Sequence, residues 1–217
     1  SYKTGDEYRA CARGRSTQFA LFLDSTGRAY SLLAHTLPSA RGQGEPLSGR
    51  LDPPDGATFP GVLIGEPSDR WVLASSAGYG FVVKLEDLYS RNRAGKAVLN
   101  VPDSYAAIAP AVVPPGDEPL LAAVNSEGRL LTFPVADLPE LPRGKGNKIF
   151  GISTRKSLIE PETLLAIAAV APGQTLKVLC GDRTMGLSYR DLAEYRGERG
   201  QRGQGEQGFF HCSYLLG

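Results

Sequence analysis

WVLASSAGYGFVVKLEDLYSRNRAGK (residues 71–96) contains most of one structural repeat. Two apolar runs, Trp71–Ala74 and Phe81–Leu85, flank a polar turn that ends at Gly78. Runs of this length bounded by Gly and Ser are typical of strands joined in a hairpin, where glycine supplies the positive φ. An acidic step, Glu86–Leu88, and a basic glycine-rich loop follow. The stretch therefore predicts a β-meander that leads into a loop rich in Arg and Lys.

The same order of signals recurs about every fifty residues. The hairpin glycines stand 51 and 50 positions apart, at Gly27, Gly78 and Gly128. The glycines of the basic loops stand 51 and 51 positions apart, at Gly44, Gly95 and Gly146. Each unit opens with a further apolar run, at Tyr8–Ala12, Val62–Ile64, Ile108–Val113 and Leu164–Val170. A period of this length, near the top of the ~20–50 range, indicates a solenoid, propeller or array.

We therefore predict an all-β fold of about four four-stranded blades of ~50 residues, with radial repetition limiting exposed edges. The chain is expected to form one domain over residues 1–217, with units at about 5–52, 56–101, 105–153 and 163–217. A fourth short strand should follow each basic loop, as at Ala97–Val101 and Lys148–Ile152. The acidic steps are either one-turn helix starts or carboxylate-capped turns. The longest helical candidate is Ser157–Ala171, whose second half we expect to be a strand.

The amino-acid composition limits the classes of function that the chain can have. The hydrophobic fraction of 41% suits a folded protein with a sizeable core, and the net charge is only +1. A nucleic-acid function must therefore rest on where the charges lie. Cys11, Cys180 and Cys212 lack the spacing of a disulfide framework or zinc site, so a reducing, cytoplasmic setting is expected. No signal peptide and no apolar run of ~20 residues occurs, and a first residue other than Met predicts a fragment of a larger protein.

The basic loops are the candidate binding sites. Glycine lets a backbone approach a ligand closely, and Arg or Lys supplies charge for phosphates. In a radial array, equivalent loops would form a positive band that follows a nucleic-acid backbone without reading bases. Solvated connections are the alternative for any single loop, but four loops in register favour the band. The candidate phosphate contacts are Arg41, Arg91, Arg93, Lys96, Arg143, Lys145, Lys148, Arg196, Arg199 and Arg202.

No active site is evident in the sequence. His35 and His211 lack partners at ligand spacing, and Gly144–Lys148 lacks the pattern of a phosphate-binding loop. We therefore expect no cofactor, no metal and no catalytic residue in this piece. A propeller that docks a protein partner stays open as an alternative, and an independent enzyme ranks last.

The sequence resembles the C-terminal domain of the gyrase A and topoisomerase IV A family, in its topoisomerase IV branch. The segments that carry the resemblance run in order along the chain, at Asp24–Arg28, Leu37–Leu47, Ala77–Phe81, Arg91–Ala97, Phe133–Pro139, Lys145–Lys148 and Gly197–Gly200. The resemblance implies a β-pinwheel, in which blades exchange a strand with their neighbours. It also implies an outer basic face that binds and bends duplex DNA and helps present the transported segment.

The resemblance also implies what lies elsewhere. The cleavage residues, Mg²⁺ and ATP would belong to other parts of an ATP-dependent type II topoisomerase, whose ATPase B subunit, with the rest of the A subunit, would supply the protein partners. A cytoplasmic, nucleoid-associated bacterial protein and no membrane partner would follow. The gyrase box Gln-Arg-Arg-Gly-Gly-Lys-Gly is not spelled here, and Gln201–Gly205 is its nearest approach. Bending is therefore expected over gyrase-type wrapping. The tail from Gly205 to Gly217 departs from the family, and either supplies an outer strand or extends from the domain.

Overall fold

The computed structural model describes residues 8–39, 41–42, 44–153, 161–180, 183–205 and 212–216. The described residues contain short strands and no helix longer than five residues. The strands are β1 Phe19–Leu23, β2 Arg28–Leu33, β3 Gly61–Leu63, β4 Arg70–Ala74, β5 Tyr79–Lys84, β6 Lys96–Ala97, β7 Ala111–Val112, β8 Leu120–Asn125, β9 Arg129–Pro134, β10 Asn147–Lys148, β11 Leu164–Val170, β12 Thr175–Cys180, β13 Arg183–Ser188, β14 Gln204–Gly205 and β15 Cys212–Leu216.

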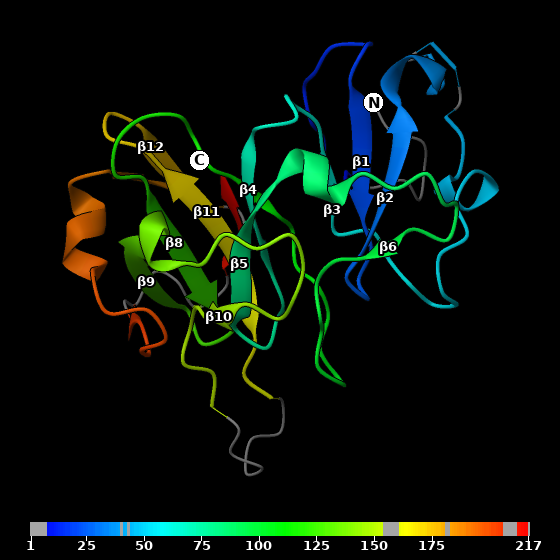
Figure 1. Cartoon of the computed structure of the whole chain (residues 1–217). Helices are drawn as coiled ribbons and strands as arrows, with labels where there is room; N and C mark the ends of the chain where they lie inside the picture. The colour runs from blue at the N-terminus through cyan, green and yellow to red at the C-terminus, as the bar shows by residue number, and fades with distance from the viewer. Residues whose placement is uncertain are drawn as a thin grey trace.

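The strands form four antiparallel sheets. Three sheets have four strands, in the orders β3-β1-β2-β6, β10-β5-β4-β7 and β11-β8-β9-β14, and the fourth is β13-β12-β15. In Figure 1 the sheet of β1, β2, β3 and β6 lies at one end, β4 and β5 lie in the middle, and β8, β9, β11 and β12 lie at the other end. The all-β blade architecture predicted from the repeat is confirmed.

Each four-stranded sheet is a hairpin from one unit flanked by two strands from the next unit. The hairpin β1–β2 pairs with β3 on one side and with β6 on the other. The same exchange places β7 and β10 beside β4–β5, and β11 and β14 beside β8–β9. The sequence units therefore do not coincide with the sheets, because the first and last strands of a unit complete the blade before it.

Two strand predictions are corrected. Tyr8–Ala12 is not a strand, whereas the equivalent runs of later units pair with the hairpin of the unit before them, as β3 does with β1. The strands after the basic loops are only two residues long, at β6 and β10. The residues after β6 bond to the hairpin glycine and not to β2. The N–H groups of Val98 and Leu99 donate to the Gly27 carbonyl at 3.0 and 2.9 Å.

Other expectations are confirmed in the described residues. The second half of 157–171 is the strand β11, while 157–160 lie outside the described residues. The acidic steps form short 3₁₀ helices, η3 Leu85–Leu88, η4 Val135–Asp137 and η5 Asp191–Tyr195. Two others are η1 Ala34–Thr36 and η2 Leu47–Gly49.

The tail differs from the expectation of an outer strand. Its strand β15 pairs with β12, on the side that β11 takes beside β8, so it fills the other flanking position of the sheet.

The hairpins are fixed by glycine and by buried polar groups. Gly27 has φ +88°, and a Cβ there would lie 2.0 Å from the Leu99 carbonyl oxygen, so no other residue fits without displacing the backbone. The buried Asp24 carboxylate accepts bonds from the N–H groups of Thr26 and Arg28 and from the Tyr30 hydroxyl at 2.7 Å. Burial raises the pKa of Tyr30, and the bond to Asp24 acts in the same direction, so Tyr30 remains the donor.

The core is apolar and lies within and between the blades. One cluster joins the second and third sheets through Val72, Leu121, Phe133 and Phe150, and a second joins the first and second sheets through Leu21, Leu73 and Phe81. No described helix is both long and apolar enough to cross a membrane.

Candidate nucleic-acid interface

Three of the basic loops lead directly into the outer strand of the preceding blade. Residues 91–96 end in β6, which pairs with β2 at Ala29↔Lys96. Residues 143–148 end in β10, which pairs with β5 at Lys148↔Tyr79, and residues 196–202 run into β14, which pairs with β9. Equivalent pairing places each of these loops at the outer edge of its sheet, as the radial argument from the sequence requires.

A repeated backbone hydrogen bond joins each loop to the segment that follows the loop before it. The N–H of Asp52 donates to the Arg93 carbonyl at 2.8 Å, that of Asn100 to Gly144 at 2.9 Å, and that of Gly151 to Gln201 at 2.8 Å. Loops 91–96, 143–148 and 196–202 are therefore each tied to the segment that follows the preceding loop. We refer to loops 41–45, 91–96, 143–148 and 196–202 as the basic band.

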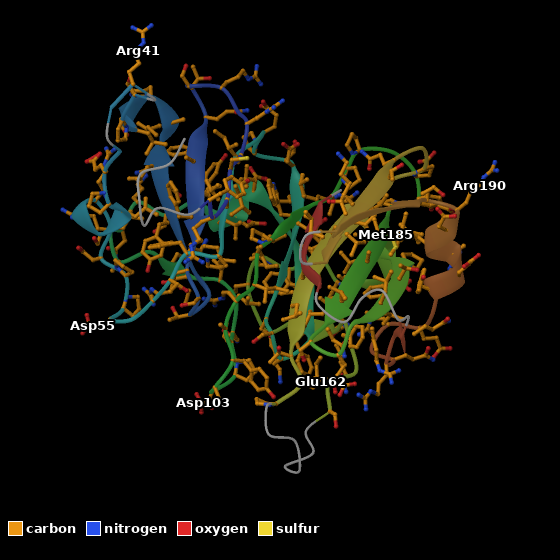
Figure 2. The ribbon with its side chains drawn as sticks, turned by 180° about the vertical axis from the view of Figure 1, so that it is seen from behind. Arg41, Asp55, Asp103, Glu162, Met185 and Arg190 are labelled. Atoms are coloured by element: carbon orange, nitrogen blue, oxygen red, sulfur yellow. The ribbon has the colours of Figure 1, made fainter. Side chains whose placement is uncertain are left out.

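The ten predicted cations all belong to the four loops of this band. Nine are exposed, and Arg199 is half-exposed. Within the described residues, five of their side chains have no hydrogen-bond or ion-pair partner: Arg41, Arg91, Arg143, Lys148 and Arg196. Arg41 extends from the molecule into solvent (Figure 2). These side chains are free to contact a polyanion.

Four other cations are held by contacts with carbonyls, a ring or a carboxylate. Lys96 Nζ donates to the Asp87 carbonyl at 2.7 Å, and Arg199 Nη1 donates to the Lys148 carbonyl at 2.7 Å. Lys145 Nζ lies 4.0 Å from the centre of the Tyr79 ring. Arg93 donates to the Gly49 carbonyl at 3.3 Å and lies 3.7 Å from the Asp52 carboxylate, in a pair exposed on both sides. Such an exposed pair contributes at most ~1 kcal/mol, so it leaves Arg93 available.

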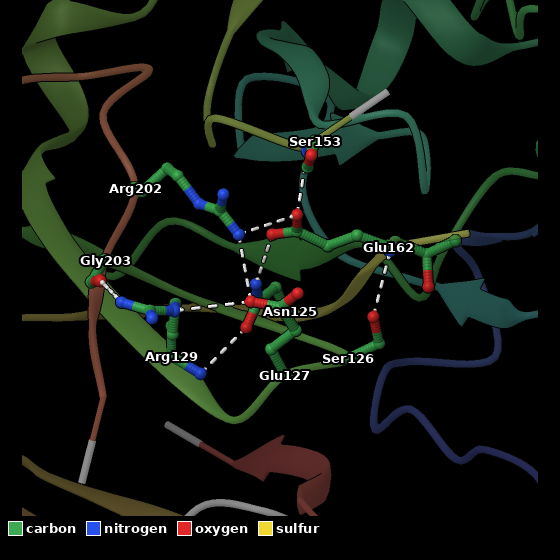
Figure 3. Close-up of polar contacts among 9 residues, drawn as sticks. Asn125, Ser126, Glu127, Arg129, Ser153, Glu162, Arg202 and Gly203 are labelled. Atoms are coloured by element: carbon green, nitrogen blue, oxygen red, sulfur yellow. Dashed lines mark hydrogen bonds and ion pairs between the residues drawn. The ribbon is translucent and has the colours of Figure 1, made fainter. Parts of the chain in front are cut away.

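Arg202 differs from the other nine cations. Its Nη2 lies 2.9 Å from both Glu127 Oε2 and Glu162 Oε2 (Figure 3). The Glu162 side chain is 0% exposed and also accepts the Asn125 side-chain amide at 2.6 Å and the Ser153 N–H at 2.8 Å. Arg202 is thus the counter-ion of a buried carboxylate, and its charge is offset by the two carboxylates beside it.

This network carries a stability prediction. In Glu162→Gln, an NH₂ group replaces one of the two oxygens that accept from Asn125, Ser153 and Arg202. The substitution also removes the negative charge that faces Arg202. We expect it to destabilise the domain by about 1–2 kcal/mol, because buried donors lose their acceptor. The corresponding loss in thermal midpoint is roughly 3–6 °C for a domain of this size.

Glu127→Gln is the matched control, since Glu127 makes the same 2.9 Å contact with Arg202 but its side chain is 37% exposed. An exposed pair should change the midpoint by no more than about 2 °C. Equal midpoints for the two variants, measured by differential scanning calorimetry, would show that burial of Glu162 is not what matters.

The sequence argument missed two arginines that hold the loops. Arg28 Nε and Nη2 donate to the carbonyls of Ala94 and Gly95 at 2.8 and 3.2 Å. Arg129 Nη1 donates to the Gly203 carbonyl at 3.3 Å. Their position could have indicated this role, because both arginines directly follow a hairpin glycine and the hairpin glycines recur at the period of the fold.

The band is suited to charge recognition rather than chemistry. Its free cations lie on flexible side chains with no carboxylate pair or histidine among them, and among the described residues no three His, Cys, Asp or Glu side chains gather as a metal site. The carboxylates inside the band are few: Glu45, which lies 3.9 Å from Arg50, and the exposed Glu198.

Comparison with known proteins places these features in context. The family model described as DNA gyrase C-terminal domain, beta-propeller, matches residues 69–114 and 120–167. The A subunit of DNA topoisomerase 4 from Pseudomonas aeruginosa is 55% identical over 93% of the chain, and that from Escherichia coli K12 is 43% identical over 93%. The chain spans 27% of the length of each of these relatives.

Solved structures agree. The structure of the E. coli ParC C-terminal domain has a TM-score of 0.82 and 41% identity, covering 100% of this chain and 87% of that one. A structure of the DNA gyrase A C-terminal domain has a TM-score of 0.70 at 12% identity, covering 95% of this chain and 67% of that one, which supports the fold alone.

Proposed function

The chain belongs to the family of C-terminal domains found in the A subunits of topoisomerase IV, and on this premise we propose that it binds the phosphate backbone of duplex DNA along the basic band. The observation that carries the proposal is the backbone hydrogen bond, made three times, that ties one basic loop to the segment following the loop before it. A band of this kind binds without base readout, because each contact is to a phosphate. Following several loops in turn requires the duplex to bend, which costs roughly 1–6 kcal/mol over a short site and is offset by added contacts.

In the parent enzyme this binding would position the transported segment for ATP-dependent decatenation and relaxation of supercoils. The piece itself would be non-catalytic, with the cleavage residues, the ATP site and Mg²⁺ in the remaining parts of the enzyme, including its ATPase B subunit. The 27% share of the relatives' length leaves room for those parts outside this chain. A cytoplasmic protein associated with the nucleoid and chromosome segregation follows from that role.

Bending rather than tight wrapping is supported by Arg202. The nearest approach to the gyrase box is Gln201–Gly205, and its only arginine is Arg202. That guanidinium already faces Glu127 and Glu162, so a phosphate would have to displace two carboxylates to bind it. A gyrase-type wrapping domain would need free cations at this end of the band.

A protein-docking propeller is the second candidate, because an apolar groove of about 740 Å³ lies between the blades. Its lining includes Phe22, Pro60, Val62 and Ile167. Docking there would leave the basic band incidental, whereas the alignment of the loops favours a polyanion. Binding of the domain to duplex DNA separates the two functions, because a groove-docking domain would show only weak affinity for a duplex.

The direct test is the salt dependence of binding. With six to nine phosphates contacted, the slope of log K against log salt concentration should lie between about −5 and −8 for a duplex. Unrelated sequences of the same length should bind with similar affinity, since the band offers no base readout. Fluorescence anisotropy between 50 and 200 mM salt measures both quantities. A slope shallower than about −2, or no binding at 50 mM salt, would remove the support for the band.

A further inference from the structure

We propose that the first residue after each hairpin glycine anchors the basic loop of the next unit, and that Arg28 is a positioning residue for the loop 91–96, an inference that rests on the proposed function. The residues concerned are Arg28, Tyr79 and Arg129. Each acts through the loop that it holds.

The three anchors occupy one register position in three sheets. Each is the first residue of its strand, β2, β5 or β9, and each is half-exposed. Their Cα partners on the outer strands are Ala97, Lys148 and Gly205. An anchor therefore faces the point at which a basic loop joins the sheet, and its side chain can reach the residues just before that point.

Arg28 grips the loop backbone at two adjacent carbonyls. Its Nε lies 2.8 Å from the Ala94 oxygen and its Nη2 lies 3.2 Å from the Gly95 oxygen. The loop lies tightly against β2, since a Cβ at Gly95 would come within 2.9 Å of the Ala29 carbonyl oxygen. A planar guanidinium presents two donors in the fixed fork that this geometry needs, and a lysine ammonium does not.

The other two anchors use different chemistry at the same place. The Tyr79 ring lies under the ammonium of Lys145, so loop 143–148 is held through one of its own cations. Arg129 Nη1 donates to the carbonyl of Gly203, the residue directly after loop 196–202, and its Nε lies 3.4 Å from Glu127. What the three share is location, which supports a common role in orienting the loops.

Order in the loop favours binding by its exposed cations. Two nitrogens of Arg28 are directed at the loop carbonyls, whereas Arg91 and Arg93 of the same loop are exposed. A loop that is already ordered loses less conformational freedom when its side chains meet phosphates. Arg28 is therefore expected to raise affinity without contacting DNA.

Two variants separate the two-donor geometry of the Arg28 guanidinium from its charge. Arg28→Lys keeps the positive charge but loses the geometry, and Arg28→Gln loses both. We expect both to weaken duplex binding by a similar factor, about five- to tenfold at 0.1 M salt, and to reduce the salt slope by about one. Backbone amide exchange at residues 94–97 should become faster in both. Arg190→Gln is the control, because Arg190 is exposed, projects from the opposite end of the molecule to Arg41 (Figure 2), and should change affinity by less than twofold.

Several outcomes would overturn the inference. Wild-type affinity and slope in Arg28→Lys, together with weakening in Arg28→Gln, would make Arg28 a direct phosphate contact. A lower thermal midpoint with unchanged affinity and exchange would make it merely structural. A wild-type protein that fails to bind duplex would instead reject the proposed function, and amide exchange at 94–97 would still report whether Arg28 holds the loop. Weakened binding in Arg91→Gln beside normal binding and exchange in Arg28→Lys would reject the anchor alone.

Discussion

Replacing Arg91, Arg143 and Arg196 together by Gln is expected to weaken duplex binding roughly 10²- to 10³-fold at 0.1 M salt. The three side chains lie in three different loops of the basic band, are exposed, and have no polar partner within the described part of the chain. Each lost phosphate contact removes about 0.9 from the salt slope and the corresponding counterion-release gain, so the slope should fall by about 2.7. The fold should be unaffected, because surface substitutions of this kind change stability by less than about 0.5 kcal/mol each.

The matched control removes the same charge elsewhere. Arg13, Lys177 and Arg190 are exposed cations outside the band. Replacing all three by Gln gives the same net charge of −2, three below the natural +1. We expect less than a fivefold loss of affinity from the control, because none of its charges belongs to the band and exposed charges are screened over ~8–10 Å. Similar losses in both triple variants, measured by anisotropy titration at several salt concentrations, would show that overall charge and not the band governs binding.

The repeat and the band could be predicted because glycine spacing reports backbone geometry. Gly27 and Gly78 have φ of +88° and +83°, and a Cβ on either would strike the backbone of the segment that follows the basic loop of the next unit. A position that admits only glycine recurs wherever the geometry recurs, which made the 51-residue period visible. The loops follow the same period, which is why three of them join equivalent outer strands.

Pairings between distant residues could not be predicted. The two-residue strands β6, β10 and β14 carry no periodicity of their own, and they join the preceding sheet through contacts far along the chain. Arg202 looks in sequence like any other loop cation, yet its partners Glu127 and Glu162 lie 75 and 40 positions away. Arg28 could equally have faced a ligand. Only the fold decides which cations meet carboxylates or carbonyls and which stay free.

Gly146→Ala should be among the most destabilising single substitutions in the band, costing about 3–4 kcal/mol. Gly146 has φ +73°, and a Cβ there would lie 2.0 Å from the Gly80 carbonyl oxygen and 2.3 Å from its carbon. Since both are backbone atoms of β5, relief requires loop 143–148 to move away and β10 to lose its pairing at Asn147↔Gly80. At roughly 2–4 °C per kcal/mol, the thermal midpoint should fall by about 10 °C.

Gly44→Ala isolates the cause, because Gly44 is the equivalent glycine of loop 41–45, with φ +74° but no atom of the described residues within 4 Å of the place that a Cβ would take. The two substitutions share the cost of a left-handed alanine, about 1–2 kcal/mol, so the difference between them measures the close approach to β5. Calorimetry on both variants should give a midpoint for Gly44→Ala only about 3–5 °C below the natural protein. Equal midpoints would mean that loop 143–148 does not lie against β5 as tightly as the structure has it. A difference of the expected size, with weaker duplex binding in Gly146→Ala alone, would show that duplex binding by Arg143 and Lys145 depends on the position of loop 143–148.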